Sequence, residues 1–218
     1  MSKAAEPVII EEHAPDYWEQ ACTELMKHDR ILKKLIPKYG SGFLRTRGDA
    51  FTTLARAIVG QQISVAAAQS VWNKVTLASK NKVNPQNILA LSAEELRAAG
   101  LSGRKVEYIL DLAKHFDSGR LHANQWKGMD DEAIIKELCE IRGIGRWTAE
   151  MFLIFNMVRP NILPLDDAGL FKAISLNYFS GEPVSRHEAR EVAANWAPWR
   201  TVATWYMWRS LNPIAVEH

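Results

Sequence analysis

Apolar side chains recur every three or four residues along most of this chain, and polar side chains fill the positions between them. This spacing is that of amphipathic α-helices. No segment alternates apolar and polar residues as a half-buried strand does, and no Asn-Gly or Asp-Gly pair joins two β-branched runs. The pattern therefore predicts an all-α fold of roughly ten helices.

Several predicted helices begin at residues that favour helix starts. Asp49, Ser64 and Ser102 each precede an apolar helical run and can cap it. A Ser followed three residues later by a Glu can form a capping box. This pattern occurs at Ser92–Glu95 and at Ser185–Glu188.

Breaks in the pattern predict the helix boundaries. The first helical run starts at Trp18 and stops near residues 37–40, and Pro85 opens a short turn. A very apolar helix is expected over residues 148–157, and the last helix from about residue 198 to residue 211.

The length of 218 residues suits one large domain or two intimate lobes. No linker, repeat or low-complexity segment divides it. We expect a single two-lobed helical domain over residues 15–213, with a cleft between the lobes. Helices of about 50–158 form the middle lobe, and the N- and C-terminal helices form the other. Residues 1–14 are expected to be flexible, and 214–218 to be a tail.

Composition excludes several classes of protein. A hydrophobic fraction of 47% and a charged fraction of 24% exclude intrinsic disorder. No apolar run approaches the ~18 residues of a membrane helix, and residues 1–16 do not resemble a signal peptide. Cys22 and Cys139 are too few for a disulfide scaffold or a four-thiolate metal site. An intracellular location is expected. The net charge of +2 permits a nucleic-acid partner without arguing for one.

Tryptophan is unusually frequent, and four of the eight tryptophans fall within residues 196–208. They can form a large aromatic core or a pocket for a flat ligand. His115 and His122 belong to no pattern of partner residues, so both are predicted to lie on the surface.

Residues 138–149, Leu-Cys-Glu-Ile-Arg-Gly-Ile-Gly-Arg-Trp-Thr-Ala, predict a helix, a tight glycine hairpin and a second helix. Both glycines can adopt positive φ and leave room for a phosphate near the backbone. Backbone N–H groups at the start of the second helix then point at the anion. An ordinary turn between helices is the alternative, but the length of the string favours DNA binding. The residues of this predicted phosphate-binding hairpin are Gly143, Ile144, Gly145, Arg146 and Thr148.

Two adjacent carboxylates, Asp166 and Asp167, follow Pro164 and open a helix. Such a pair often serves only as a helix cap. Here it lies about twenty residues after the hairpin, across one apolar helix. That placement returns the carboxylates to the side where bound phosphates would lie.

The hairpin and the aspartate pair resemble the helix–hairpin–helix base-excision DNA glycosylases, and within them the 3-methyladenine DNA glycosylase II branch. Residues 54–66 resemble that branch's duplex-wedge segment, and residues 198–208 its C-terminal aromatic helix. The resemblance spans about residues 15–212. The chain lacks room for the N-terminal β-rich domain of longer members, and it lacks the four cysteines of members that hold an iron–sulfur cluster.

The resemblance implies excision of alkylated purines such as 3-methyladenine and 7-methylguanine. Asp167 is then the catalytic carboxylate that stabilises an oxocarbenium-like sugar and orients water, while Asp166 caps the helix or supports the loop. Bifunctional relatives carry a lysine nucleophile where this chain has Trp147. A monofunctional enzyme that uses water is therefore expected.

The resemblance also implies roles in DNA binding. Gln62 matches the residue that fills the gap left by a flipped base, with Gln61 beside it. A cationic base suits an aromatic pocket, for which Trp147, Trp208 and Tyr206 are the candidates. A monovalent Na⁺ or K⁺ is implied at the backbone carbonyls of Cys139, Ile141 and Ile144, and no other cofactor.

The expected partner is double-stranded DNA with damaged bases, bound by a monomer in the bacterial cytoplasm or the nucleus. Two alternatives stay open. One is a glycosylase for uracil, hypoxanthine or an oxidised purine. The other is a non-catalytic helix–hairpin–helix module, which would need the hairpin but neither Asp167 nor Gln62.

Overall fold

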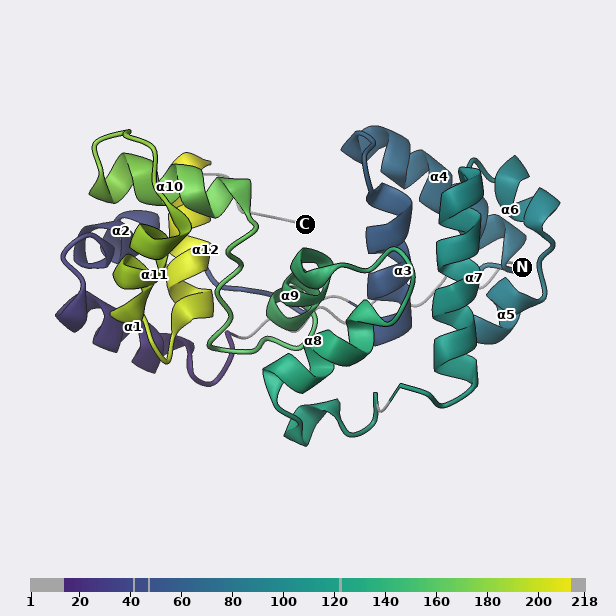
Figure 1. The fold of residues 1–218 in the computed structure, drawn as a ribbon, viewed down its shortest axis with the longest axis horizontal. Coiled ribbons are helices and arrows are strands. Elements are labelled where there is room, and N and C mark those ends of the chain that lie inside the picture. Colours follow the sequence, from purple (N-terminus) through teal and green to yellow (C-terminus); the bar gives the residue numbers. More distant parts are fainter. Residues whose placement is uncertain (1–13, 41, 47, 122, 213–218) are drawn as a thin grey trace, which may run out of the picture. The chain divides into compact units, whose positions relative to one another are not determined.

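The computed structural model of the chain describes residues 14–40, 42–46, 48–121 and 123–212. Within those ranges the chain forms twelve α-helices, one 3-10 helix and no strand, which confirms the predicted all-α fold (Figure 1). Nearly all of the predicted flexible segment 1–14, the predicted tail 214–218 and His122 lie outside the described residues. The α-helices are α1 (Trp18–His28), α2 (Leu32–Tyr39), α3 (Ala50–Gly60), α4 (Val65–Ala78), α5 (Pro85–Leu89), α6 (Ala93–Ala98), α7 (Gly103–Asp117), α8 (Asp131–Cys139), α9 (Arg146–Phe155), α10 (Ala168–Tyr178), α11 (Arg186–Ala194) and α12 (Arg200–Leu211).

The predicted helix caps are present. Asp49, Ser64 and Ser102 each accept a hydrogen bond from a backbone N–H in the first turn of α3, α4 and α7. Both predicted capping boxes are complete, because in each the Ser and Glu side chains bond to backbone N–H groups at the start of α6 and α11. Among the described helices, none combines the length and the apolar character that a membrane crossing needs.

The first predicted helical run is in fact two helices. The chain turns at Asp29, whose carboxylate Oδ1 accepts the backbone N–H groups of Ile31 at 2.7 Å and Leu32 at 2.9 Å. These N–H groups at the start of α2 lack acceptors within the helix. A side chain that satisfies them favours a new start over continuation of α1.

Three further predictions are corrected. Residues 85–89 form a short helix capped by Asn84 rather than only a turn. The apolar helix α9 begins at Arg146 and ends at Phe155, two residues earlier at each end than expected. His115 is buried rather than on the surface, because its Nδ1 lies 2.9 Å from the backbone carbonyl of Asp111, one turn earlier on α7. That bond satisfies the ring and allows it to face the core.

The chain divides into two compact units. Unit 2 is Gly48–Phe152, and unit 1 contains the described residues of Met1–Arg47 and Leu153–His218. In unit 1, α12 packs against α1, α2 and α10 (Figure 1). In unit 2, α7 packs against α3, α5 and α6. α12 and α7 are therefore the helices around which the two cores are built.

Aromatic rings fill much of the core of unit 1. Trp18 on α1 meets Trp205 on α12 edge to face, with ring centroids 5.3 Å apart. Trp205 meets Tyr206 in the same manner at 4.9 Å. Trp196 is fully buried as well. For these residues of the C-terminal tryptophan cluster, the aromatic-core interpretation is correct.

Asp29 is a buried polar centre in unit 1. Besides the start of α2, its carboxylate accepts the hydroxyl of Tyr178 at 2.7 Å and the indole Nε1–H of Trp196 at 3.1 Å. A buried carboxylate is tolerated only when it is well hydrogen-bonded, and these donors come from three segments. Asp29 therefore ties α2, the end of α10 and the chain before α12 together.

We expect Asp29→Ala to lower the free energy of unfolding by about 2–4 kcal/mol, because it leaves buried donors without an acceptor. Urea unfolding followed by tryptophan fluorescence measures the change. Asp117→Ala, which removes an exposed carboxylate, is the control and should change stability little. A midpoint for Asp29→Ala equal to that of the control would contradict this role.

Candidate functional site

Asp167 stands at the start of α10 and is half-buried. Its Oδ1 accepts the backbone N–H of Leu170 at 2.6 Å, which makes Asp167 the N-cap of α10. The same oxygen accepts the indole Nε1–H of Trp208, on α12, at 2.8 Å. The carboxylate is thus fixed by two donors from two helices, one of them at the positive end of a helix dipole.

Gly169 makes this arrangement possible. A Cβ at residue 169 would lie 3.1 Å from Asp167 Oδ1 and 3.4 Å from Trp208 Cδ1. A side chain there would press between the carboxylate and the indole that bonds to it. Gly169 was not among the predicted site residues, although a glycine in the first turn of a helix is unusual because it lowers helix propensity.

Trp208 is buried, and its ring stacks on Phe155 at the end of α9 with centroids 5.7 Å apart. Trp208 was predicted as a base-pocket residue, and the structure places it beside the predicted catalytic carboxylate. Tyr206 was predicted for the same pocket, but it is 1% exposed and its hydroxyl lies 3.5 Å from Cys22 Sγ. Because α12 turns Tyr206 into the aromatic core, it presents no accessible face to a ligand.

Asp166 is exposed and forms an ion pair with Arg186 on α11, at 2.7 Å. This ion pair links the loop before α10 to α11, and support of the loop stays a prediction for Asp166. The other predicted role, capping the helix, belongs to Asp167 instead.

The predicted phosphate-binding hairpin lies between α8 and α9 in unit 2. Gly143 has φ +84°, and a Cβ there would lie 2.2 Å from the ring of Tyr108 on α7. Gly145 differs, because its φ is outside the left-handed region and no heavy atom lies within 4 Å of a built Cβ. Ile144 is buried between them. Gly143 is thus needed for the turn itself, whereas Gly145 leaves open space beside the start of α9.

Side chains from α3 and α7 hold the hairpin. Gln61 donates from Nε2 to the carbonyl of Gly143 at 2.8 Å. Asp111 on α7 accepts the backbone N–H of Arg142 at 2.9 Å. Gln62, the next residue after Gln61, is exposed and has φ +57°. Gln61 and Gln62, predicted as one wedge, therefore have different environments.

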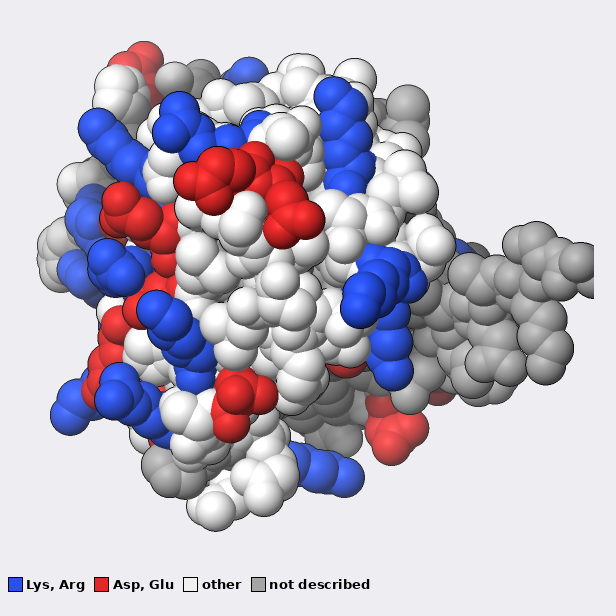
Figure 2. All heavy atoms as spheres, turned by 90° about the vertical axis from the view of Figure 1, so that its right-hand side faces the viewer, with Lys and Arg blue, Asp and Glu red and all other residues white. Residues whose placement is uncertain are grey.

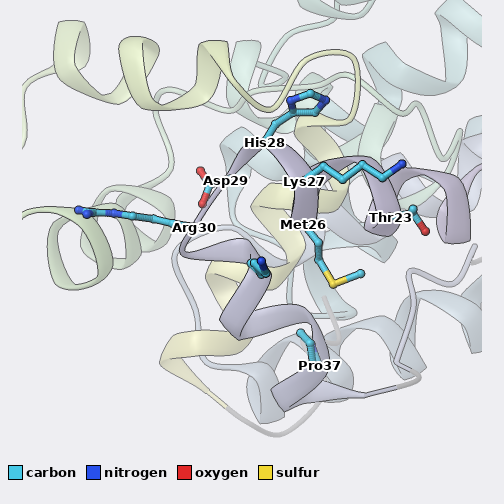
Figure 3. Close-up of a pocket in the computed structure, with 8 residues that line it drawn as sticks. Thr23, Met26, Lys27, His28, Asp29, Arg30 and Pro37 are labelled. Atoms are coloured by element: carbon cyan, nitrogen blue, oxygen red, sulfur yellow. The ribbon is translucent and has the colours of Figure 1, made fainter.

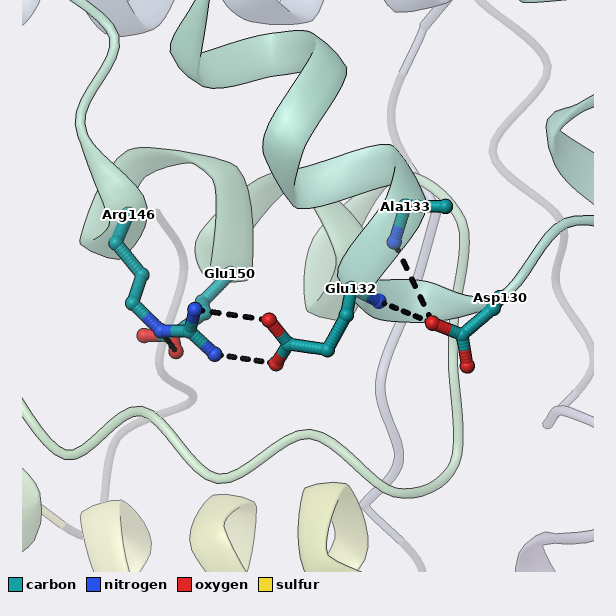
Figure 4. A network of polar contacts seen from close by, with 5 residues as sticks. All are labelled: Asp130, Glu132, Ala133, Arg146 and Glu150. Carbon is teal, nitrogen blue, oxygen red and sulfur yellow. Dashed lines mark hydrogen bonds and ion pairs between the residues drawn. The ribbon is translucent and has the colours of Figure 1, made fainter.

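Arg146 is engaged by carboxylates (Figure 4). Its guanidinium forms a two-point ion pair with Glu132 on α8, and its Nε donates to Glu150 at 2.9 Å. The hydrogen bond from Arg146 lowers the pKa of Glu132, and Glu132 in turn raises the pKa of Arg146. Arg146 was predicted to bind phosphate, but in this structure its guanidinium is engaged by carboxylates of α8 and α9.

Trp147 is 44% exposed, which is unusual for so large an apolar ring. Thr148 follows it and is partly exposed. Both lie in the first turn of α9, where backbone N–H groups have no acceptor within the helix. Trp147 belongs to unit 2, whereas Asp167 and Trp208 belong to unit 1.

Two other features involve charged side chains of the described residues. On the face in Figure 2, Lys and Arg are interspersed with Asp and Glu rather than gathered into one basic patch.

A hollow of ≈ 880 Å³ in unit 1 has Lys27, Arg30, Lys33 and Asp29 in its wall (Figure 3). Asp29 already accepts four hydrogen bonds, one of them from the Tyr178 hydroxyl. Within the described residues, no cluster of His, Cys, Asp and Glu could hold a metal ion.

Comparison with known proteins gives a consistent picture. Residues 55–198 match the family described as "HhH-GPD superfamily base excision DNA repair protein". The DNA-3-methyladenine glycosylase of Bacillus subtilis is 31% identical over 201 residues, which cover 86% of this chain and 66% of that protein.

Two solved structures are similar to this chain over most of its length. The crystal structure of a DNA-3-methyladenine glycosidase from Bacillus halodurans has a TM-score of 0.84 and 33% identity, and the match covers 88% of this chain and 89% of that chain. The 3-methyladenine DNA glycosylase of Schizosaccharomyces pombe, in complex with abasic DNA, has a TM-score of 0.74 and 27% identity, with 88% and 96% covered.

The two hairpin glycines should respond differently to alanine. Gly143→Ala should lower the free energy of unfolding by ~2 kcal/mol or more, because it combines positive φ with a clash against Tyr108. Gly145→Ala should leave the melting temperature unchanged and weaken binding to any DNA roughly two- to tenfold, because it crowds the phosphate approach. Thermal melts and fluorescence anisotropy measure the two effects. Equal behaviour of both variants would contradict the separate roles.

Proposed function

This chain belongs to the HhH-GPD superfamily of base excision DNA repair proteins, and we propose that it is a monofunctional DNA glycosylase that excises alkylated purines. The observation that carries the proposal is the hydrogen-bonded pair of Asp167 and Trp208 at the start of α10. Relatives and solved structures with the name 3-methyladenine glycosylase or glycosidase support the substrate class.

Asp167 is suited to stabilise a sugar cation. Alkylation at N3 or N7 gives the purine a positive charge, so the base departs with the electron pair of its glycosidic bond and leaves an oxocarbenium-like C1′. A fixed carboxylate beside C1′ lowers the energy of that cation. The same carboxylate orients water for attack on C1′ and can accept its proton. Because Leu170 and Trp208 already hold Asp167, little reorganisation is required during the reaction.

Water, rather than an amine, is the proposed nucleophile. Residue 147, where bifunctional relatives carry a lysine, is tryptophan. Without a Schiff base at the sugar, the abasic product stays intact, and strand cleavage should require added alkali. The exposed face of Trp147 is suited to stack on a cationic base.

DNA is held by the hairpin in this proposal. The open space at Gly145 and the start of α9 lets a backbone phosphate approach N–H donors. Gln62, exposed on a loop, is suited to fill the gap that the flipped nucleotide leaves. The protein would act as a monomer where cellular DNA is found, in the bacterial cytoplasm or the nucleus.

We also propose a monovalent Na⁺ or K⁺ at the backbone carbonyls of Cys139, Ile141 and Ile144. The Ile141 carbonyl accepts the N–H of Ile144 at 3.1 Å and keeps a second lone pair. Hard oxygen donors of this kind suit hard cations. When bound, the cation would add positive charge at the hairpin, and these backbone groups would hold it without any side-chain ligand.

Asp167→Asn should abolish most base release while lesion-DNA binding survives. Asparagine keeps an oxygen that can accept the bonds from Leu170 and Trp208 but removes the charge, so we expect a fall of roughly two to three orders of magnitude. Release of free 3-methyladenine and 7-methylguanine from methylated DNA under single-turnover conditions measures this, and binding to an abasic-analogue duplex is measured in parallel.

Asp166→Asn is the matched control, because it loses only the exposed ion pair to Arg186. It should retain activity near that of the wild type. An active Asp167→Asn beside an inactive Asp166→Asn would reverse the assignment. Wild-type protein that releases neither base would overturn the proposed function.

Trp147→Leu tests recognition of base charge. Leucine keeps apolar bulk but removes the π-face, so excision of cationic 7-methylguanine should fall about two- to thirtyfold. Excision of neutral hypoxanthine should fall less, because it loses stacking alone. The ratio of kcat/KM for the two bases is the measurement. A ratio equal to that of the wild type would show that Trp147 does not sense charge.

A further inference from the structure

Gln61 joins two segments of unit 2 that lie 82 residues apart in the sequence. It is the C-cap of α3, and its amide donates from Nε2 to the Gly143 carbonyl at 2.8 Å. The side chain is only half-exposed. One of its two amide N–H donors is therefore engaged by the protein's own hairpin.

α7 supports both ends of this connection. Lys105 donates from Nζ to the carbonyl of Val59, near the end of α3, at 2.7 Å. One turn further along, the Tyr108 ring fills the space beside Gly143. Partial burial lowers the pKa of the Lys105 ammonium. The end of α3 and the hairpin thus rest on the same helix.

Gln62 follows directly and has a backbone conformation that requires support. A φ of +57° is unfavourable for any residue with a side chain, and such residues persist where their surroundings hold them. The residue directly before it, Gln61, is hydrogen-bonded to the hairpin carbonyl of Gly143. Gln62 itself stays exposed.

We propose that Gln61 is a positioning residue that couples the hairpin to the loop carrying Gln62. The hairpin grips the DNA backbone, and the Gln61–Gly143 hydrogen bond then sets where Gln62 enters the duplex. Gln61 does not contact DNA in this arrangement, which differs from the wedge role that its sequence neighbourhood suggested. The proposal rests on the proposed function, because it presumes that Gln62 enters damaged DNA.

A double-mutant cycle tests the coupling. Gln61→Leu should lower single-turnover base release from a paired lesion by roughly two- to tenfold, the effect of one lost hydrogen bond. In a Gln62→Ala background the same change should have almost no further effect, because Gln61 acts through Gln62. Gln61→Glu, which has nearly the same shape but cannot donate to the carbonyl when ionised, should behave like Gln61→Leu.

Two controls separate positioning from a general loss of structure. Gln86→Leu removes a comparable side-chain bond in the same unit, to Asp117 at 2.9 Å, and should leave base release unchanged. A lesion in single-stranded DNA needs no wedge, so Gln61→Leu should release its base at the wild-type rate. Affinity for undamaged duplex should also stay at the wild-type value.

A readout without chemistry keeps this test independent of the proposed reaction. In the Asp167→Asn background, the fluorescence of a 2-aminopurine placed opposite an abasic analogue reports how far this base is unstacked when the protein binds the duplex. Gln61→Leu and Gln61→Glu should reduce that signal as much as Gln62→Ala does. Three outcomes would overturn the positioning role, even if base release by the wild type is confirmed. They are additive losses of activity in the double-mutant cycle, an equal loss of activity on single-stranded DNA, and an unchanged 2-aminopurine signal.

Discussion

Two hydrogen bonds to one oxygen of Asp167 are the constraint on which the proposed active centre in unit 1 depends. One comes from the first turn of α10 and the other from the indole of Trp208 on α12. α12 is itself fixed by the aromatic contacts of Trp205 with α1. The packing of a hydrophobic core thus decides where a carboxylate stands, and a core substitution far from the site can misplace the reacting group.

Unit 1 uses aspartate at a helix start twice, with different results. Asp29 is enclosed by four donors and belongs to the core, while Asp167 stays half-exposed at the first turn of α10. The two lie at opposite ends of α10, because Tyr178, the last residue of that helix, bonds to Asp29. A hydrogen-bonded carboxylate thus stabilises the core where it is buried, and where it is partly exposed it can serve the catalytic role proposed for Asp167.

Much of the fold could be predicted because helix starts are encoded locally. Ser92 with Glu95 and Ser185 with Glu188 form capping boxes from residues three positions apart. The roles of Gly169, Tyr108 and Gln61 depend instead on contacts between distant segments, which periodicity does not reveal. Tyr206 and His115 were misplaced for a related reason, since the face of a helix that becomes buried depends on its neighbours.

The backbone features of the candidate site could be predicted from the sequence more readily than the ion pairs of its charged side chains. The hairpin glycines and Asp167 follow from the order of residues, but the pairing of Arg146 with Glu132 and Glu150 requires knowledge of how α8 and α9 meet. A basic residue beside a phosphate-binding turn is therefore no proof of a phosphate contact.

The pairing of the hairpin arginines has a consequence for how this protein would search DNA. Arg142 faces Glu107 and Asp111, and Arg146 faces Glu132 and Glu150, so carboxylates oppose both cations. Binding through backbone N–H groups displaces few of the counterions that surround DNA, and it is the release of those counterions that makes affinity fall as salt rises. The contacts of such a hairpin with DNA would therefore depend only weakly on ionic strength.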